Sequence, residues 1–315
     1  MKKATTVDRR VLIDAIFEDV FDLDPVNREQ HFEGLQVDAS IIQSVKELLA
    51  LSACESGPIS RPAYALLGDE GEEFKPGDTL GVYTIIREIG RGGMGVIYLA
   101  RRADGQFDRN VAIKILKPGK MVFANVSQFS HEINLLAGLE HPRLCRLYNS
   151  GITPGNFPYM VMEYVNGEPF DVIHTWEQPE ILQFFQMICD GVGYAHTRGI
   201  VHGDLKPENI LVRDKAPVIM DFGISAFSGA QPSLHMTPRY ASPEQINQLS
   251  ITTQSDIYSL GLIFSEYTKR FGHAELTAIS NKATATDPIE RYLTLDSFSS
   301  DIVNVLTSQP VSAVK

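Results

Sequence analysis

The stretch from residue 201 to residue 223, VHGDLKPENILVRDKAPVIMDFG, constrains the fold and chemistry of this chain more than any other stretch. Two apolar runs within it, at 210–212 and 218–220, flank a predicted tight turn at 213–217. Polar residues are concentrated just before the first run and at the end of the second. This pattern predicts a short β-ribbon with polar side chains on the loops at its ends. Those side chains belong to Asp204, Lys206, Asn209 and Asp221.

The four side chains together suit a magnesium-bound polyphosphate beside a hydroxyl group that is to lose its proton. Carboxylate and amide oxygens are ligands that Mg²⁺ accepts, and an ammonium group offsets the charge of a phosphoryl group in transfer. Any one of these residues alone would indicate no more than a polar loop after a helix. The complete set indicates a magnesium–phosphate site.

Composition and charge are those of a globular protein, and they exclude several classes. With 315 residues, 43% of them hydrophobic, the chain could form one large domain or two to three smaller ones. The net charge of −11 argues against a nonspecific nucleic-acid binder, which needs a basic surface. Cys54, Cys145 and Cys189 lack C-x-x-C spacing, so we expect no disulfide framework and a reducing, cytoplasmic compartment. No long apolar run occurs, so we expect neither a membrane span nor a signal peptide.

Residues 1–53 are predicted to form a small helical region. Apolar residues recur at roughly helical spacing from 7 to 20, and a second amphipathic helix is expected from about 38 to 51. Short helices bury little by themselves, so this region is expected either to stabilise the rest of the chain or to bind a docking partner or a second copy. Residues 54–78, with GPISRP, KPG and the acidic run GDEGEE, are predicted to be a linker.

From Leu80 onward the pattern changes to β-strands joined by a glycine-rich turn. VYTIIREIG is β-branched and apolar, and it continues into GRGGMGVIYLA, which holds Gly90, Gly92 and Gly95. Glycines let backbone amides approach a phosphate without a Cβ in the way. G-x-G-x-x-G also occurs in dinucleotide-binding turns, but here it bridges two strands instead of opening a helix. The strand VAIKIL follows and carries Lys114.

Taken in order, these segments resemble the bacterial, eukaryotic-like (Hanks-type) serine/threonine protein kinases over about residues 80–306. The resemblance implies an α+β, bilobal protein-kinase-like fold in a catalytic domain at 79–310, preceded by the N-terminal helical extension. A small antiparallel β lobe with one helix would span about 79–163, and a larger, mainly helical lobe about 167–310. The implied activity is transfer of the ATP γ-phosphoryl group to serine or threonine hydroxyls of proteins in bacterial signalling.

The resemblance also assigns roles to individual residues. Asp204 would orient the acceptor hydroxyl and take its proton, and Lys206 would offset the charge of the transferring group. Lys114, paired with Glu132, would hold the α- and β-phosphates. The residues implied to hold Mg²⁺, with Mn²⁺ as an alternative, are Asn209 and Asp221. The residues implied to surround the nucleotide are Gly90, Gly92, Gly95, Val96, Ala112, Lys114, Met162, Glu163, Val165 and Leu211.

Two further contacts are implied in the large lobe. Asp256 would clamp the backbone of the catalytic loop, because a buried carboxylate must accept hydrogen bonds. Arg291 would pair with Glu244 and pin the peptide-positioning segment at 237–244 to the rest of the lobe.

Three departures from the family pattern bear on function. The sequence His-Gly-Asp at 202–204 lacks the arginine that receives an activation-loop phosphate in most regulated kinases, so we expect activity without such a phosphate. Met236 replaces a glycine, so the usual local backbone geometry is not carried over. Only about ten residues separate Tyr267 from a helix predicted near Leu276, which implies a shortened large lobe without the usual docking helix.

Two other classes remain open from the sequence alone. His-Gly-Asp followed five residues later by asparagine also occurs in enzymes that resemble aminoglycoside and choline phosphotransferases, which act on small molecules. Against them stand Lys206 in LKPEN, the Ser-Pro-Glu triplet at 242–244 and Asp256 in SDIYSLG, which resemble protein-phosphorylating enzymes. The chain could also be an ATP-binding pseudokinase scaffold, although every catalytic position holds the expected residue type.

Overall fold

The computed structural model describes residues 72–92, 95–103, 105, 109–116, 133, 136–155, 157–222 and 238–314, together with isolated positions between residues 16 and 46. The chain divides into two compact units, Met1–Gly68 and Asp69–Lys315. In the first unit, described buried residues form a small apolar cluster that consists of Ile16, Phe32, Ile41 and Val45. Ile41 and Val45 therefore face inward, as helical periodicity predicts for them.

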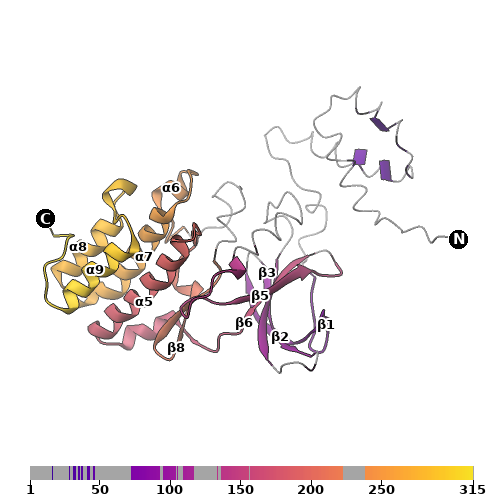
Figure 1. Cartoon of the computed structure of the whole chain (residues 1–315), viewed down its shortest axis with the longest axis horizontal. Coiled ribbons are helices and arrows are strands. Elements are labelled where there is room, and N and C mark those ends of the chain that lie inside the picture. The colour runs from indigo at the N-terminus through magenta and orange to yellow at the C-terminus, as the bar shows by residue number, and fades with distance from the viewer. Residues whose placement is uncertain are drawn as a thin grey trace. The chain divides into compact units, whose positions relative to one another are not determined.

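The second unit begins with a six-stranded antiparallel sheet, the small lobe (Figure 1). Its strands are β1 (Thr79–Leu80), β2 (Tyr83–Gly92), β3 (Gly95–Arg102), β4 (Asn110–Leu116), β5 (Leu147–Ile152) and β6 (Pro158–Glu163). Their spatial order is β1-β2-β3-β4-β6-β5. Of the helix predicted to follow β4, the described residues 133, 136 and 137 are helical, whereas 138–140 are described and are not.

Two apolar clusters lie on opposite faces of this sheet. Successive side chains of a strand point to opposite faces, and β4 follows this rule. Val111, Ile113 and Ile115 belong to a small cluster on the outer face. Ala112 and Leu116 belong to the large cluster that continues into the helical lobe. The inner face of the sheet is therefore the face toward the helices.

The large lobe is mainly helical. Its helices are α5 (Gln178–His196), α6 (Pro243–Ile246), α7 (Thr253–Thr268), α8 (Ala274–Ala283) and α9 (Leu295–Leu306), with short 3-10 turns η2 (Phe170–Thr175), η3 (Pro207–Asn209), η5 (Lys269–Phe271) and η6 (Pro288–Glu290). Helix α5 packs on α9, and α7 packs on α8. Edge-to-face contacts of Phe264 with Phe185 and Phe298 join these helices. The predicted α+β fold and the short connection after Tyr267 are both confirmed.

The predicted β-ribbon is present as β8 (Ile210–Arg213) and β9 (Ala216–Ile219), with β7 (Glu168–Pro169) beside it. Its two turn residues, Asp214 and Lys215, have φ values of 51° and 60°. Two left-handed residues at the centre of a two-residue loop are the requirement of a type I′ turn, whose twist matches that of paired strands. The ribbon carries η3 at its entrance and Asp221 at its exit.

Candidate active site

Lys114 lies on the inner face of β4, opposite Ile97 of β3 and Met160 of β6. Its side chain is almost fully buried, and its ammonium group is 2.8 Å from an Asp221 carboxylate oxygen. A buried ammonium group requires such a partner, because burial disfavours an unpaired charge. Glu132, the partner that the sequence predicts, lies outside the described residues, so its pairing with Lys114 stays a prediction.

The loop before β8 brings three of the predicted side chains into contact. The Lys206 ammonium group is 2.7 Å from an Asp204 carboxylate oxygen. The Asn209 amide donates to the Asp204 backbone oxygen at 2.8 Å and lies 3.4 Å from its carboxylate. Asp221 joins this group because Met220, the residue before it, donates its backbone N–H to the Asn209 carbonyl at 2.8 Å. Residues from both ends of the ribbon therefore meet at one place.

Asp221 has a left-handed backbone, with φ of 58°. Such a conformation is uncommon for a residue with a side chain and is concentrated at functional sites. The ribbon and the Lys114 ion pair hold it in place.

The oxygen atoms at this place suit a magnesium ion. Asp221 offers a carboxylate, and the Asn209 amide nitrogen is committed to Asp204, so its Oδ1 is the atom of that side chain that could bind a cation. The described residues contain no group of three His, Cys, Asp or Glu side chains that could hold a metal by themselves. Few protein ligands, supplemented by phosphate oxygens, are the usual arrangement for Mg²⁺.

A buried carboxylate holds the backbone of the catalytic loop. Asp256 of α7 accepts the backbone N–H groups of His202 and Gly203, both at 2.8 Å. The predicted clamp is confirmed. Burial by itself would raise the pKa of Asp256, but hydrogen bonds from His196 and from the loop hold that pKa below its ordinary value.

Two residues that the sequence did not indicate complete the support of this loop. His196, at the end of α5, contacts the Asp256 carboxylate at 2.8 Å. Gln245 of α6 donates its side-chain amide to the Gly203 carbonyl at 2.7 Å. Neither residue stands in a local pattern that points to the loop, because both contacts join segments distant in sequence. Gly203 itself has φ of 75°, a conformation that favours glycine.

The structure corrects one residue of the predicted nucleotide pocket. Val96 lies opposite Ile115 and belongs to the outer cluster, so its side chain faces away from Lys114. The prediction that the Val96 side chain is among those surrounding the nucleotide is therefore wrong. Ile97 lies opposite Lys114 and packs against the inner cluster with Ala112, so it occupies the face that was predicted for Val96.

The glycine-rich turn lies at the ends of β2 and β3, where Gly92 pairs with Gly95. A Cβ on Gly95 would stand 1.9 Å from the backbone oxygen of Ile115. Any larger residue at this position would therefore push β3 away from β4. Gly90 lies earlier on β2, opposite Ile97.

The segment that joins the lobes carries the remaining predicted pocket residues. Met162 lies opposite Ala112 on the inner face of the sheet. The Glu163 backbone N–H donates to the Arg146 backbone oxygen. The Glu163 carbonyl accepts from the Cys145 thiol at 3.6 Å, and its second lone pair could meet a ligand. Val165 is buried. Leu211 lies beneath the segment, because a Cβ on Gly167 would come within 3.2 Å of its Cβ.

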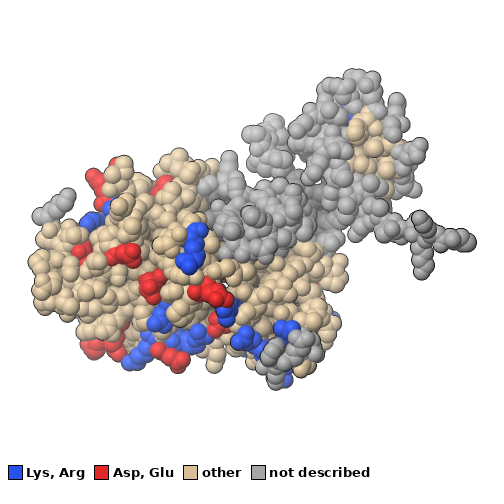
Figure 2. Space-filling view, viewed as in Figure 1, with Lys and Arg blue, Asp and Glu red and all other residues tan. Residues whose placement is uncertain are grey.

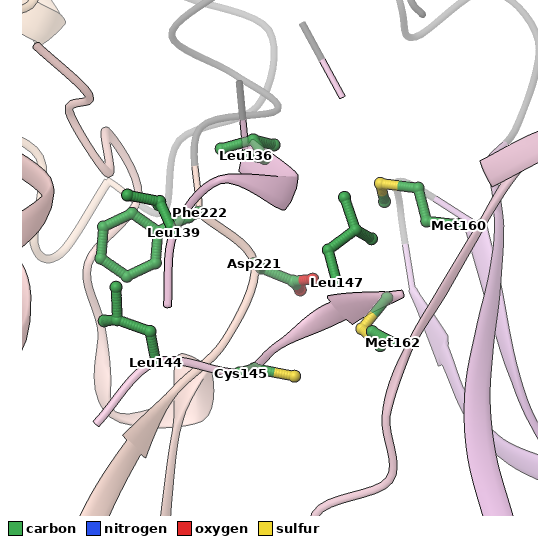
Figure 3. A pocket seen from close by; sticks show the side chains of 9 residues that line it. All are labelled: Leu136, Leu139, Leu144, Cys145, Leu147, Met160, Met162, Asp221 and Phe222. Atoms are coloured by element: carbon green, nitrogen blue, oxygen red, sulfur yellow. The ribbon is translucent and has the colours of Figure 1, made fainter. Parts of the chain in front are cut away.

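A small cavity of about 50 Å³ is lined by Asp221 and by apolar side chains from both lobes (Figure 3). Its lining is apolar apart from Asp221, whose carboxylate points into the group. Met162 and Cys145 line it as well, and burial raises the pKa of the Cys145 thiol to about 12. The thiol is therefore neutral and acts as a small apolar side chain here.

The peptide-positioning segment is anchored by an ion pair. Both terminal nitrogens of Arg291 donate to the Glu244 carboxylate, at 2.7 and 2.8 Å. Burial alone would raise the pKa of Glu244, but Arg291 and the hydroxyl of Ser255 lower it to about 2. The predicted pair is confirmed. Met236 and Thr237, the preceding residues of this segment, lie outside the described residues.

A β lobe with a glycine turn and a buried lysine, facing a loop with Asp204, Lys206 and Asn209, defines a nucleotide-dependent phosphotransferase fold. Residues 83–307 match the family described as the protein kinase domain. The chain belongs to this family.

Bacterial proteins are among the relatives in sequence. The chain is 35% identical over 199 residues to the serine/threonine-protein kinase pkn2 of Myxococcus xanthus, covering 58% of this chain and 24% of that protein. It is 32% identical over 265 residues to the serine/threonine-protein kinase PrkC of Bacillus subtilis, covering 70% of this chain and 40% of that protein. The chain thus spans less than half the length of these curated relatives.

The fold also matches solved structures. The kinase domain of Mycobacterium tuberculosis PknI superposes with a TM-score of 0.60 at 23% identity, covering 74% of this chain and 99% of that structure. At this identity the match supports the fold alone. Separately, none of the described helices is long and apolar enough to cross a membrane.

Proposed function

We propose that this protein is a serine/threonine protein kinase that transfers the γ-phosphoryl group of ATP to protein hydroxyls. The observation that carries the proposal is the contact of Asp204 with Lys206 and Asn209, in a loop that α7 holds by its backbone. The names of the relatives support a protein substrate, because pkn2 and PrkC are serine/threonine-protein kinases. A small-molecule phosphotransferase is less well supported, since the family match is to the protein kinase domain.

Each residue has a defined task in this proposal. Asp204 would accept a hydrogen bond from the incoming hydroxyl and take its proton as the oxygen attacks the γ-phosphorus, while the bond from that phosphorus to the bridging oxygen breaks and ADP leaves. Lys206, already 2.7 Å from Asp204, stands where it can offset negative charge on the transferring group. Lys114 exchanges its contact with Asp221 for the α- and β-phosphates. Glu132 would then hold Lys114 in place.

The proposed cofactor set is ATP with Mg²⁺ or Mn²⁺, with Asn209 and Asp221 as the protein ligands of the metal. A bound divalent ion would neutralise phosphate charge. Ile97 and Ala112 on the inner face of the sheet, together with Leu211 of β8, would enclose the adenine ring, with Met162 behind it. The carbonyl of Glu163 and the backbone of Val165 would bind the edge of the ring.

The catalytic loop is proposed to need no phosphate on the activation segment. Gly203 offers no guanidinium group to receive a phosphate, and both of its backbone polar groups already have protein partners in Asp256 and Gln245. Replacement of the three serines at positions 225, 228 and 233, which lie outside the described residues, by alanine should therefore leave the rate of phosphoryl transfer within about twofold. A collapse of that rate in the triple variant would show that this part of the proposal is wrong.

One assay separates the proposed activity from its alternatives. Purified full-length protein is incubated with radiolabelled ATP, Mg²⁺ and a generic basic protein, beside the variant Asp204→Asn. We expect label on the basic protein for the wild type, and a loss of about 10³-fold or more in the variant, because the general base and its charge are removed together. A parallel incubation replaces the basic protein with an aminoglycoside or choline, and label on these acceptors alone would favour the small-molecule enzymes. ATP binding without any transfer would favour a scaffold.

The division of the chain and its location are also proposals. We assign residues 1–53 to a helical region that binds a docking partner or a second copy, 54–78 to a linker and 79–310 to the catalytic domain, in a cytoplasmic protein. Deletion of residues 1–75 tests the first part. Retained transfer to the generic substrate with loss of substrate choice would support docking, whereas an insoluble product would support a structural role.

A further inference from the structure

An ion pair joins the last strand of the small-lobe sheet to the β-ribbon of the large lobe. The guanidinium group of Arg213, the last residue of β8, donates to the carboxylate of Glu163, the last residue of β6. The two residues are 50 positions apart in the chain, so this is a tertiary contact. Their side chains are 37% and 24% exposed, and a pair this accessible contributes little to the stability of a fold. What the pair can do is fix the place of Glu163.

The backbone of Glu163 is held by further contacts. Its N–H donates to the Arg146 backbone oxygen at 2.8 Å, and its carbonyl accepts the Cys145 thiol at 3.6 Å. Within the sheet, Glu163 lies opposite Val111 of β4. These contacts hold the main chain, and Arg213 adds a contact from the ribbon to the side chain. The carbonyl proposed to bind the edge of the adenine ring therefore belongs to a residue that both lobes restrain.

Strand β8 also holds the far end of the segment that joins the lobes, residues 163–169. Strand β7 pairs with β8 there, and Pro169 lies opposite Leu211. The joining segment is thus attached to β8 near both of its ends, by the side chain of Arg213 and by the pairing of β7. Leu211, which is proposed to lie against the adenine ring, is on the same strand. One strand therefore sets the position of both the face and the edge of the bound base.

We propose that Arg213 is a positioning residue that gives the site its preference for adenine over guanine, by holding Glu163 in place. This inference rests on the proposed use of ATP. Adenine carries an amino group, a donor, where guanine carries an oxygen, an acceptor. A carbonyl held in place accepts from the amino group of adenine, whereas guanine would leave two acceptors facing each other without a hydrogen. Without Arg213 the Glu163 carbonyl can move, which weakens the contact with adenine and relieves the conflict with guanine.

Isothermal titration calorimetry with the full-length protein and Mg²⁺ tests the proposal. The ligands are the non-hydrolysable β,γ-imido analogues of ATP and GTP. We expect the wild type to bind the ATP analogue at least about tenfold more tightly than the GTP analogue. Arg213→Gln should weaken binding of the ATP analogue about fivefold, the loss of about one hydrogen bond, and should change binding of the GTP analogue less than about twofold. Arg213→Lys, which keeps the charge, should restore part of the preference.

Lys215→Gln is the matched control. Lys215 lies in the turn of the same ribbon, and its ammonium group is 2.8 Å from a carboxylate oxygen of Glu180 in α5. The change removes the same charge from the same ribbon and leaves the Arg213–Glu163 pair in place. Figure 2 shows basic and acidic side chains intermixed along the lower edge of the described surface, where Figure 1 places β8. Charge alone is therefore controlled by a neighbour of Arg213, and both affinities of Lys215→Gln should stay within about twofold of wild type.

Other outcomes would overturn the proposal. Equal weakening of both analogues in Arg213→Gln would show a merely structural role, and an unchanged ratio of the two affinities, or the same change of ratio in Lys215→Gln, would exclude positioning by Arg213. If Arg213→Gln fails to fold, as judged by circular dichroism, Glu163→Gln replaces it, because it removes the other end of the pair and keeps the backbone carbonyl. An unchanged ratio in that variant would be equally decisive against the proposal. Calorimetry reads binding alone, so a protein that shows the expected ratios without phosphoryl transfer would refute the proposed function and support this inference.

Discussion

Asp256→Asn should distinguish the contribution of Asp256 to the stability of the large lobe from its role in positioning the catalytic loop. The wild-type carboxylate accepts three hydrogen bonds: from the backbone of Gly203 on one oxygen, and from the backbone of His202 and the ring of His196 on the other. Asparagine keeps a single acceptor oxygen. In its better orientation it satisfies His202 and His196, and turns its own N–H₂ group toward the N–H of Gly203.

The expected loss in the free energy of unfolding follows from these contacts. One buried N–H left without an acceptor costs about 1–3 kcal/mol, and the two remaining hydrogen bonds lose their charge assistance, at about 0.5–1 kcal/mol each. Removing a buried charge recovers part of this loss. We expect a decrease of about 3 kcal/mol in the free energy of unfolding. The released Gly203 backbone lets Asp204 shift, and a displacement of about 1 Å can reduce kcat about 100-fold.

Asp301→Asn is the matched control. Asp301 is another buried carboxylate of the large lobe, and it accepts hydrogen bonds from the Tyr292 hydroxyl, from Ser312 and from the Ala313 backbone. It makes none of the catalytic-loop contacts described above. Urea unfolding followed by circular dichroism should show similar losses for both variants. Transfer assays at 20 °C should show a large loss of kcat for Asp256→Asn alone. A wild-type kcat in Asp256→Asn, or an equal loss in Asp301→Asn, would refute the clamp as a positioning device.

Three further predictions follow from single positions. Gly203→Ala should lower the free energy of unfolding by about 1–2 kcal/mol, because φ is 75° there. Gly193→Ala in helix α5 should not lower it, because a Cβ at that position would make an ordinary 3.8 Å contact. Equal effects of the two changes in urea unfolding would contradict the backbone argument. Ile97→Ala should raise KM for ATP several-fold with little loss in the free energy of unfolding. Val96→Ala should lower that free energy by about 2 kcal/mol and leave KM for ATP nearly unchanged. The opposite pattern would restore Val96 to the pocket. The pKa of Glu244 falls from 4.5 to about 2, so its contribution to the free energy of unfolding is complete above pH 4.5 and is lost as the pH falls through 2. This contribution, on the order of 3 kcal/mol, should be missing when the unfolding of Glu244→Gln is measured against pH.

Much of the fold could be predicted from local patterns. The β-branched and apolar runs of β2 and β4 and the polar residues around β8 and β9 indicate strands, because β-branched residues are enriched in strands and turn residues interrupt apolar runs. The left-handed turn at 214–215 is occupied by aspartate and lysine, so its position was predictable and its type I′ geometry was not. Tertiary pairing of the two strands imposes that geometry.

The error at Val96 has a physical cause. Val96 and Ile97 are both apolar and β-branched, so their order in the strand does not tell which of them faces the nucleotide side. A shift of one residue reverses the face of every side chain in a strand. The face is fixed by pairing with β4, where Gly95 lies so close to Ile115 that only one register is accommodated. That information lies in the contact between strands.

The support of Gly203 joins the catalytic loop to the peptide-positioning segment. Its N–H is bound by Asp256 of α7, and its carbonyl accepts from Gln245 of α6. The residue before Gln245 is Glu244, which Arg291 binds with both terminal nitrogens. A displacement of α6 would therefore pull on the catalytic loop through one hydrogen bond, while α7 resists it through another. Protein groups already occupy both polar atoms of Gly203, which supports the proposal that the loop needs no added phosphate. Loss of Gln245 should then affect kcat more than it affects the free energy of unfolding.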